Sequence, residues 1–204
     1  MKKNKVIIFD LDGVLINSAP NMRYALNQTS KKMNINLQFS LYKNFLGLPF
    51  EKIIQNMGIY KDVNLIKRNY EYFSKQKLSK IKIKKKFLLK LNQLKKKYYL
   101  AVFTSKNRSR TKIILSEKKL FDCIITADDV SSGKPNPQGL KKILKLLKLK
   151  PNNCLYIGDS IYDYKASKLA NIKYRHASWG YDQNLNKKKF IKKIKNLSEI
   201  EKIL

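Results

Sequence analysis

The sequence has no long hydrophobic run, and none of its apolar stretches approaches the roughly 18–20 residues that a membrane-spanning helix requires. The first apolar run, residues 6–9, ends at Asp10 and is shorter than the hydrophobic segment of a secretory signal, which needs about 7–15 residues. Both absences argue against a membrane or secreted protein. We expect a cytoplasmic protein with no membrane partner.

Cysteine and histidine are also scarce. The 204 residues include two cysteines, Cys123 and Cys154, and one histidine, His176. Two cysteines in separate apolar segments provide neither a disulfide framework nor a cysteine-based metal site, so both are expected to be reduced thiols in the core. The single histidine lies near the end of a predicted strand, and we expect a structural rather than a catalytic role for it.

Acidic residues are few beside basic ones. The chain has 14 Asp and Glu against 45 Lys and Arg, which gives a formal net charge of +31, and only five of the basic residues are arginines. An excess of lysine, asparagine and isoleucine is typical of the coding bias of an AT-rich genome, and in residues 140–148 the lysines form the solvated face of an amphipathic helix. We favour this compositional interpretation. A surface that binds polyanions such as nucleic acid is the alternative.

What the sequence does contain is a pattern of short apolar strands that alternate with amphipathic helices. Strands are predicted at residues 5–9, 99–103, 122–126, 154–157 and 174–177. Helices are predicted at residues 85–97, 110–117, 137–147 and 162–170, followed by a short edge strand at 190–191 and a closing helix at 198–204 capped by Ser198. Such alternation indicates an α/β fold with a doubly wound, Rossmann-like parallel sheet covered on both faces.

Helical spacing alone dominates between the first strand and the others. Helices are expected at residues 51–57 and 63–77, and no strand is predicted there. We therefore expect an α/β core made of residues 1–16 and 83–204. An inserted α-helical cap domain, residues 17–82, would cover the carboxyl-terminal edge of the sheet.

Four polar clusters interrupt the apolar pattern after predicted strands. They are Asp10-Leu11-Asp12-Gly13-Val14, Thr104-Ser105-Lys106, residues 133–137 around Lys134, and Gly158-Asp159-Ser160 with Asp163. In an open parallel sheet these positions meet at the edge where ligands bind. The four aspartates would repel one another unless cations lie among them, and a hard cation such as Mg²⁺ would complement the single charge of Lys134. Such a set of groups suits phosphoryl transfer.

The segments FDLDGVL, FTSKN, GKPNP and IGDSIYD, in this order, resemble the four motifs of the haloacid-dehalogenase-like (HAD) hydrolase superfamily. The helical insertion directly after the first motif is similar to that of the phosphoglycolate-phosphatase-like branch. The resemblance covers essentially the whole chain. It implies an α/β hydrolase core with a helical cap and a magnesium-dependent phosphatase activity.

The resemblance also implies a role for each matching residue. Asp10 would be the nucleophile that becomes an aspartyl-phosphate, and Asp12 the general acid and base. Thr104 would hydrogen-bond the phosphoryl group, and Lys134 would bridge the nucleophile and a phosphate oxygen.

Mg²⁺ would be held by the Asp10 carboxylate, the main-chain carbonyl of Asp12 and Asp159. Asp163 would be either an outer partner of the metal or an anchor for Lys134. The alternative role for these carboxylates is to cap helices, as Asp159 could before residues 162–170. The other matches are expected to bind phosphate or substrate or to support the groups that do: Gly13, Ser105, Lys106 and Asp163.

A few departures and neighbours bear on the subtype. Asp12 argues against dehalogenation, which needs no proton donor for the leaving group. Phe50 stands where the β-phosphoglucomutase branch has an arginine for a second phosphate. Arg108, with Ser105 and Lys106, is a candidate for contact with an anionic tail of the substrate. The loop of residues 179–181 is expected at the rim of the cleft, and the cap aromatics, Tyr42 and Tyr70 among them, in the core.

We therefore expect a Mg²⁺-dependent phosphatase of a small phosphorylated metabolite, acting as a monomer or a homodimer. A phosphatase of nucleic-acid ends or nucleotides, suggested by the net charge, is one alternative, although a tightly closing cap argues against a nucleic-acid partner. A β-phosphoglucomutase-like phosphotransferase is another. A basic binding module on an inactive scaffold is opposed by the intact motif residues.

Overall fold

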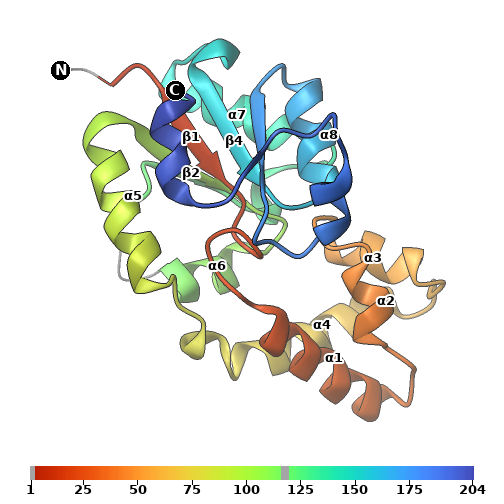
Figure 1. Ribbon diagram of the computed structural model, residues 1–204. Helices are drawn as coiled ribbons and strands as arrows, with labels where there is room; N and C mark the ends of the chain where they lie inside the picture. Colours follow the sequence, from red (N-terminus) through yellow and green to blue (C-terminus); the bar gives the residue numbers. More distant parts are fainter. Residues whose placement is uncertain (1–2, 116–119) are drawn as a thin grey trace.

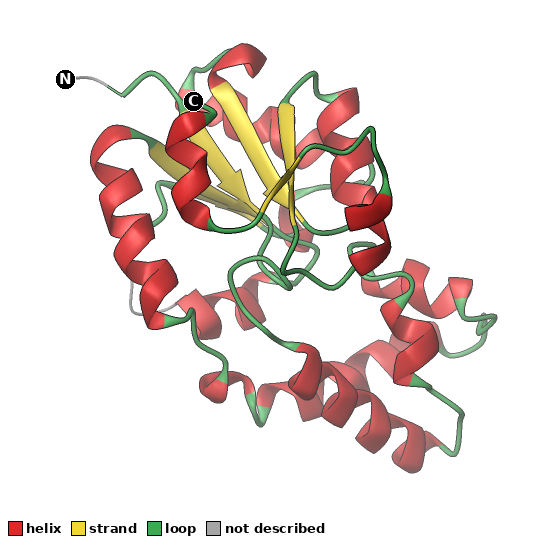
Figure 2. Cartoon of the chain, viewed as in Figure 1, coloured by secondary structure: helices red, strands yellow, loops and turns green. Residues whose placement is uncertain are grey.

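The structure, a computed structural model, describes residues 3–115 and 120–204. Six strands within these residues form one parallel sheet in the order β3-β2-β1-β4-β5-β6 (Figures 1 and 2). The strands are β1 (Val6–Phe9), β2 (Tyr99–Phe103), β3 (Cys123–Ile125), β4 (Cys154–Gly158), β5 (Lys173–Ala177) and β6 (Lys193–Ile194). Strand β1 pairs with β2 on one side and β4 on the other. The chain thus winds outward in both directions from β1, and the predicted doubly wound sheet is confirmed.

Helices cover both faces of the sheet. They are α5 (Lys85–Lys97), α6 (Arg108–Leu115), α7 (Gln138–Leu147) and α8 (Ile161–Leu169). Ile7 and Phe9 of β1 pack in one core cluster with residues of α5 and α6, whereas Val6 and Ile8 pack in a second with residues of α7 and α8. Because alternate residues of a strand point to opposite faces, the wholly apolar sequence of β1 fills both clusters.

The inserted segment is helical, as predicted. It contains α1 (Ala19–Met33), α2 (Phe39–Lys43), α3 (Phe50–Asn56) and α4 (Val63–Lys75), and between the first and last of these the only bridge is the isolated pair Leu46 and Leu48. These helices enclose a hydrophobic core of their own, separate from the two beside the sheet. In Figure 1 this cap lies beyond the carboxyl ends of the strands, with α1 against α4.

The last part of the chain differs from the prediction. The edge strand is Lys193–Ile194, not residues 190–191, because Lys193 and Ile194 are the residues that pair with His176 and Ala177 of β5, although Ile191 is also buried. The closing segment is a 3₁₀ helix, Leu197–Lys202, and its cap is Asn196, whose side chain accepts a hydrogen bond from the Ser198 amide. The predicted helix over 110–117 begins at Arg108, and its last two positions lie outside the described residues.

Short 3₁₀ segments complete the described fold: Leu78–Lys80, Ala127–Asp129, Pro151–Asn153 and Gln183–Lys187. Both cysteines are free thiols, Cys154 buried and Cys123 half-buried. His176 is buried near the carboxyl end of β5, where it pairs with Gly158 of β4, and neither ring nitrogen has a hydrogen-bond partner among the described residues. None of the described helices is long and apolar enough to cross a membrane.

Candidate active site

The first predicted cluster lies where the chain leaves β1. Asp10 follows the strand directly, and its amide donates to the Ile157 carbonyl of β4 at 2.8 Å. Gly13 turns the chain with a φ of +83°, a left-handed conformation that favours glycine. A Cβ at Gly13 would lie 2.0 Å from an Asp159 carboxylate oxygen, so this glycine also lets the turn approach that acid.

Lys134 joins two of the predicted carboxylates. Its ammonium donates to Asp10 at 2.8 Å and to Asp163 at 2.7 Å, and its side chain is fully buried. Asp163 also accepts from the Tyr156 hydroxyl at 2.5 Å and from the Ser160 hydroxyl at 2.6 Å. Because these donors occupy both of its oxygens, Asp163 is an anchor for Lys134.

Burial and charge move the pKa values of these groups in opposite directions. Burial raises the pKa of Asp10 to about 7, although the adjacent Lys134 ammonium lowers it. Burial also disfavours the charged forms of Lys134 and Asp163. Their mutual attraction outweighs it, so the pKa of Lys134 is raised and that of Asp163 is lowered. Asp163 is therefore the carboxylate that the lysine holds ionised most firmly.

Asp159 follows β4 and lies on the other side of Asp10. One carboxylate oxygen accepts from the Tyr181 amide at 2.6 Å. Burial, together with the nearby Asp10 charge, raises the pKa of Asp159 well above its usual range. The alternative role as a helix cap is wrong for this residue, because Ser160 is the residue that caps α8.

Carboxylate oxygens of Asp10, Asp159 and Asp163 lie within 4.8 Å of one another. Such a group of hard oxygen donors, in which burial and neighbouring acids raise the pKa of Asp10 and Asp159, fits a divalent cation of the Mg²⁺ type. Since Asp163 already accepts from Lys134, Tyr156 and Ser160, the carboxylates with capacity left for a metal are Asp10 and Asp159.

Asp12 is held at the opening toward the cap. Its carboxylate accepts from the Ser18 hydroxyl, and its other oxygen lies 3.2 Å from the Lys106 ammonium. Burial and the neighbouring Arg110 lower the pKa of Lys106 to about 8. Asp12 thus faces the cavity from a fixed position with a partly exposed carboxylate.

The second cluster follows β2. The Thr104 amide donates to the Ile125 carbonyl of β3 at 3.0 Å, which fixes the turn, and the Thr104 hydroxyl accepts from the Lys106 amide at 3.2 Å. Ser105 crosses to the cap, where its hydroxyl donates to the Gly47 carbonyl at 2.7 Å. The two neighbours therefore differ: Thr104 faces the carboxylates, and Ser105 ties the core to the cap.

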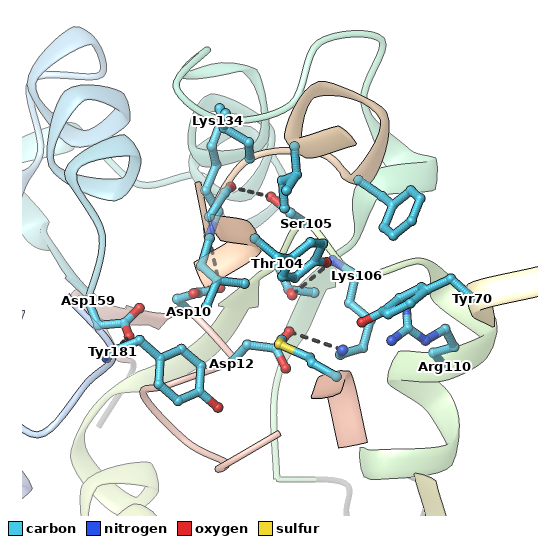
Figure 3. A pocket seen from close by; sticks show the side chains of 17 residues that line it. Asp10, Asp12, Tyr70, Thr104, Ser105, Lys106, Arg110, Lys134, Asp159 and Tyr181 are labelled. Carbon is cyan, nitrogen blue, oxygen red and sulfur yellow. Dashed lines mark hydrogen bonds and ion pairs between the residues drawn. The ribbon is translucent and has the colours of Figure 1, made fainter. Parts of the chain in front are cut away.

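One small cavity of about 60 Å³ brings these groups together (Figure 3). It is lined by the predicted residues Asp10, Asp12, Thr104, Ser105, Lys106, Lys134 and Asp159. Gly13 and Asp163 lie directly behind it, against Asp159 and Lys134 respectively. Asp163 is the one predicted carboxylate that the cavity does not reach.

Three other residues that line the cavity were not predicted from the sequence to do so. Tyr42 and Tyr70 were expected in the core of the cap, but they also line the cavity, and so does Arg110. Arg110 lies in the first turn of α6, four residues after Lys106, and this nearness to the second motif is the signal in the sequence that could have found it. Arg108 is instead half-exposed and paired with Asp129, away from the cavity.

The loop after β5 contributes one of its two aromatic residues. The Tyr181 ring lines the cavity, and its hydroxyl accepts from the Ser18 amide at 2.7 Å. Trp179 packs against Phe87 at 5.5 Å between ring centroids and donates to the Val14 carbonyl at 2.9 Å. Tyr181 thus belongs to the site, and Trp179 belongs to the core.

Comparisons with known proteins agree with this arrangement. The family model described as haloacid dehalogenase-like hydrolase matches residues 7–177. The phosphoglycolate phosphatase of Aquifex aeolicus is 30% identical over 186 residues, which cover 87% of this chain and 86% of that protein. The pyrophosphatase PpaX of Bacillus mycoides is 29% identical over 191 residues, which cover 87% of this chain and 85% of that protein.

Solved structures share the fold. A proposed phosphoglycolate phosphatase from Lactobacillus plantarum has a TM-score of 0.89 at 22% identity over the whole of both chains. CbbY from Rhodobacter sphaeroides, in complex with phosphate, has a TM-score of 0.82 at 18% identity over 97% of this chain and 96% of that one. Because the family model spans most of the sequence and the relatives align over nearly their full length, the chain belongs to the haloacid dehalogenase-like hydrolases and is an enzyme of the phosphatase type.

Proposed function

We propose that this protein is a Mg²⁺-dependent phosphatase that hydrolyses a small phosphomonoester through an aspartyl-phosphate on Asp10. The observation that carries the proposal is the small cavity between cap and core in which Asp10, bound to Lys134, faces Asp12 and Thr104. A nucleophile, an acid and base, and hydrogen-bond donors for phosphoryl oxygens are then present together.

In the first step an Asp10 carboxylate oxygen attacks phosphorus, the bond from phosphorus to the ester oxygen breaks, and Asp12 gives its proton to the departing alcohol. In the second step Asp12 takes a proton from water as the water oxygen attacks phosphorus. The bond between phosphorus and Asp10 then breaks, which releases inorganic phosphate and restores both carboxyl groups. Dividing the reaction in this way replaces one difficult displacement with two easier ones.

Lys134 and Thr104 would assist without changing covalently. The Lys134 ammonium is held by Asp163 at 2.7 Å, so it stays beside Asp10 when a phosphoryl group arrives and can donate to one of its oxygens. The Thr104 hydroxyl is oriented by the Lys106 amide, from which it accepts at 3.2 Å, and would donate to another phosphoryl oxygen. Both donors are buried, where such interactions are stronger than in water.

Mg²⁺ would be held by the carboxylates of Asp10 and Asp159 and by the main-chain carbonyl of Asp12. When bound, such an ion neutralises negative charge on a phosphoryl group and on the surrounding carboxylates. Asp163 would serve as the anchor of Lys134, because its oxygens already accept from three donors.

The cavity favours a small substrate. It lies between cap and core, with Tyr42 and Tyr70 of the cap facing Thr104 and Asp12 of the core. A cap closed in this way keeps bulk water from the phosphorylated nucleophile. The small volume argues against nucleic-acid ends. Phe50, which stacks on Tyr70 at 4.7 Å between centroids, gives no cation for a mutase-type second phosphate.

The test is phosphate release from a panel that contains 2-phosphoglycolate, pyrophosphate, sugar phosphates and mononucleotides, with Mg²⁺ and with EDTA. Asp10→Asn is expected to lower turnover by a factor of at least ~10⁴ while the circular dichroism spectrum stays unchanged. Asp62→Asn is the matched control, because Asp62 is an exposed cap residue whose left-handed φ of 54° suits asparagine. Normal turnover by Asp10→Asn would contradict the assignment.

A further inference from the structure

The cavity has a second charged end that the proposed chemistry does not use. At one end a single lysine, Lys134, lies among Asp10, Asp159 and Asp163. At the other end, toward α4 and α6, two cations, Lys106 and Arg110, face one carboxylate, that of Asp12. Figure 3 shows Asp159 and Arg110 on opposite sides of Asp12 and Thr104.

Arg110 is the group at this end that lacks a charged partner. The residue is 6% exposed, and none of the ion pairs found across residues 3–115 and 120–204 includes its guanidinium. One terminal nitrogen donates to the Ser74 hydroxyl at 2.9 Å, and the buried Nε has no hydrogen-bond partner. Because arginine stays protonated and a buried unpaired charge is costly, this arrangement calls for an anion.

The surroundings of Arg110 suit an oxyanion. The Tyr70 ring packs on the guanidinium, with its centroid 5.1 Å from the central carbon, and the buried Nε stays without a hydrogen-bond partner. Tyr42 and Tyr70 also line this end of the cavity and bring hydroxyl groups from the cap. A planar fork beside a lysine and hydroxyl donors matches a carboxylate or a phosphate group.

We propose that Lys106 and Arg110 bind a second anionic group, carried by the leaving group of the substrate. This inference rests on the proposed function, since it assumes that the phosphoryl group to be transferred lies between Asp10 and Thr104. The substrate class then narrows to small phosphomonoesters, or short diphosphates, with a second negative charge close to the first. Binding energy from that remote group would orient the reacting phosphorus.

A purely structural role is the competing explanation. Through Ser74, which in turn donates to Asn21 at 2.7 Å, Arg110 also joins α6 to helices α4 and α1 of the cap. If that contact were its only role, replacing Arg110 would affect all substrates to the same extent. Discrimination between a charged and a neutral substrate therefore separates the two explanations.

The experiment compares 2-phosphoglycolate and pyrophosphate with a neutral isostere, 2-hydroxyethyl phosphate. In the wild-type enzyme kcat/KM for at least one of the two substrates with a second anionic group is expected to exceed that for the isostere by ~10-fold or more. Arg110→Met should remove that preference and leave kcat/KM for the isostere within about 3-fold. Arg108→Met is the matched control, because Arg108 is half-exposed and outside the cavity.

Binding to Asp10→Asn, which is not expected to turn over, tests the inference without turnover. Calorimetry with each compound should show tighter binding of those that carry a second anionic group, and the double variant Asp10→Asn/Arg110→Met should lose the difference. Arg110→Lys, which keeps the charge, is used if the methionine variant does not fold. Equal affinities for charged and neutral compounds would overturn the inference while phosphate release upheld the proposed function. Preferential binding of the compounds with a second anionic group, without phosphate release by the wild-type enzyme from any substrate, would overturn the proposed function and uphold the anion site. Tighter binding of 2-phosphoglycolate would identify the second anionic group as a carboxylate, and tighter binding of pyrophosphate would identify it as a phosphate.

Discussion

At the scale of single residues, the metal-free folded protein disfavours the ionised forms of the Asp10 and Asp159 carboxyl groups. Burial raises the pKa of Asp10 to about 7, and burial and Asp10 together raise that of Asp159 well above its ordinary value. The folded, metal-free protein therefore retains protons that the unfolded chain releases. By linkage, these groups make stability fall as pH rises from about 4 to about 7 and above.

Asp159→Asn removes one of these charges. In EDTA at pH 8 the variant is expected to melt about 3 °C or more above the wild type, and the difference should shrink as the pH is lowered toward about 4, where the unfolded chain also keeps the proton of this carboxyl group. Addition of MgCl₂ at pH 8 should raise the melting temperature of the wild type and not that of the variant. Thermal unfolding followed by circular dichroism measures both effects. A variant less stable than the wild type at pH 8 in EDTA would refute the account.

At the scale of elements, the turn between α2 and α3 holds the cap against the core. Gly47 has a φ of +104°, and its carbonyl accepts from Ser105 at 2.7 Å. A Cβ at this position would lie 2.4 Å from the Ser160 hydroxyl oxygen, next to the acids of the site. Closure of the cap thus depends on a close approach that only glycine permits.

Gly47→Ala is therefore expected to lift the cap from the core and lower kcat/KM by ~10-fold or more, because a misplaced cap admits water and loosens the substrate. Gly58→Ala provides the matched comparison. Gly58 has a similar φ of +84°, but a Cβ there would meet nothing within 4 Å. Both variants should lose about 1–2 kcal/mol in urea unfolding from backbone strain, and Gly58→Ala alone should keep normal kinetics. Equal losses of activity would argue against a role of the Gly47 contact in closure.

At the scale of the whole molecule, the charge of +31 is the dominant long-range force. The lysines are spread along the chain, and the two that line the cavity, Lys106 and Lys134, are buried beside carboxylates. The remaining excess lies largely on solvated helix faces, such as Lys141 and Lys145 of α7. Self-repulsion of this kind destabilises a compact state and weakens when salt screens it.

Raising NaCl from ~10 mM to ~200 mM, which shortens the Debye length from about 30 Å to below 8 Å, should raise the melting temperature by at least ~2 °C. A scanning calorimeter measures this directly. If the charge is compositional, an oligonucleotide should bind no more tightly than the non-specific range, Kd ~10⁻⁴–10⁻⁶ M at physiological salt. A melting temperature that falls with salt, or tight and specific oligonucleotide binding, would favour a surface selected for polyanions.

Most elements were predictable because their signals are local. The apolar run before Asp10, the amphipathic pattern before Tyr99 and the turn residues around Gly158 define β1, α5 and β4 within a residue or two. The edge strand was misplaced by three residues, because in a lysine-rich segment Ile191 and Ile194 are equally apolar and both are buried. Only packing against the rest of the sheet chooses between them.

The sequence by itself determined which polar side chains meet at the cavity, since Asp10, Thr104, Lys134 and Asp159 come after strands and parallel strands end at one edge. Tertiary structure alone decided how they pair. Lys134 reaches Asp10 across 124 residues of chain, and Arg110 comes to face Tyr70 of the cap. Hydrophobic periodicity depends on residues close together in the sequence, so it predicts single strands and helices. The angle at which the cap meets the core depends on contacts between segments far apart in the sequence.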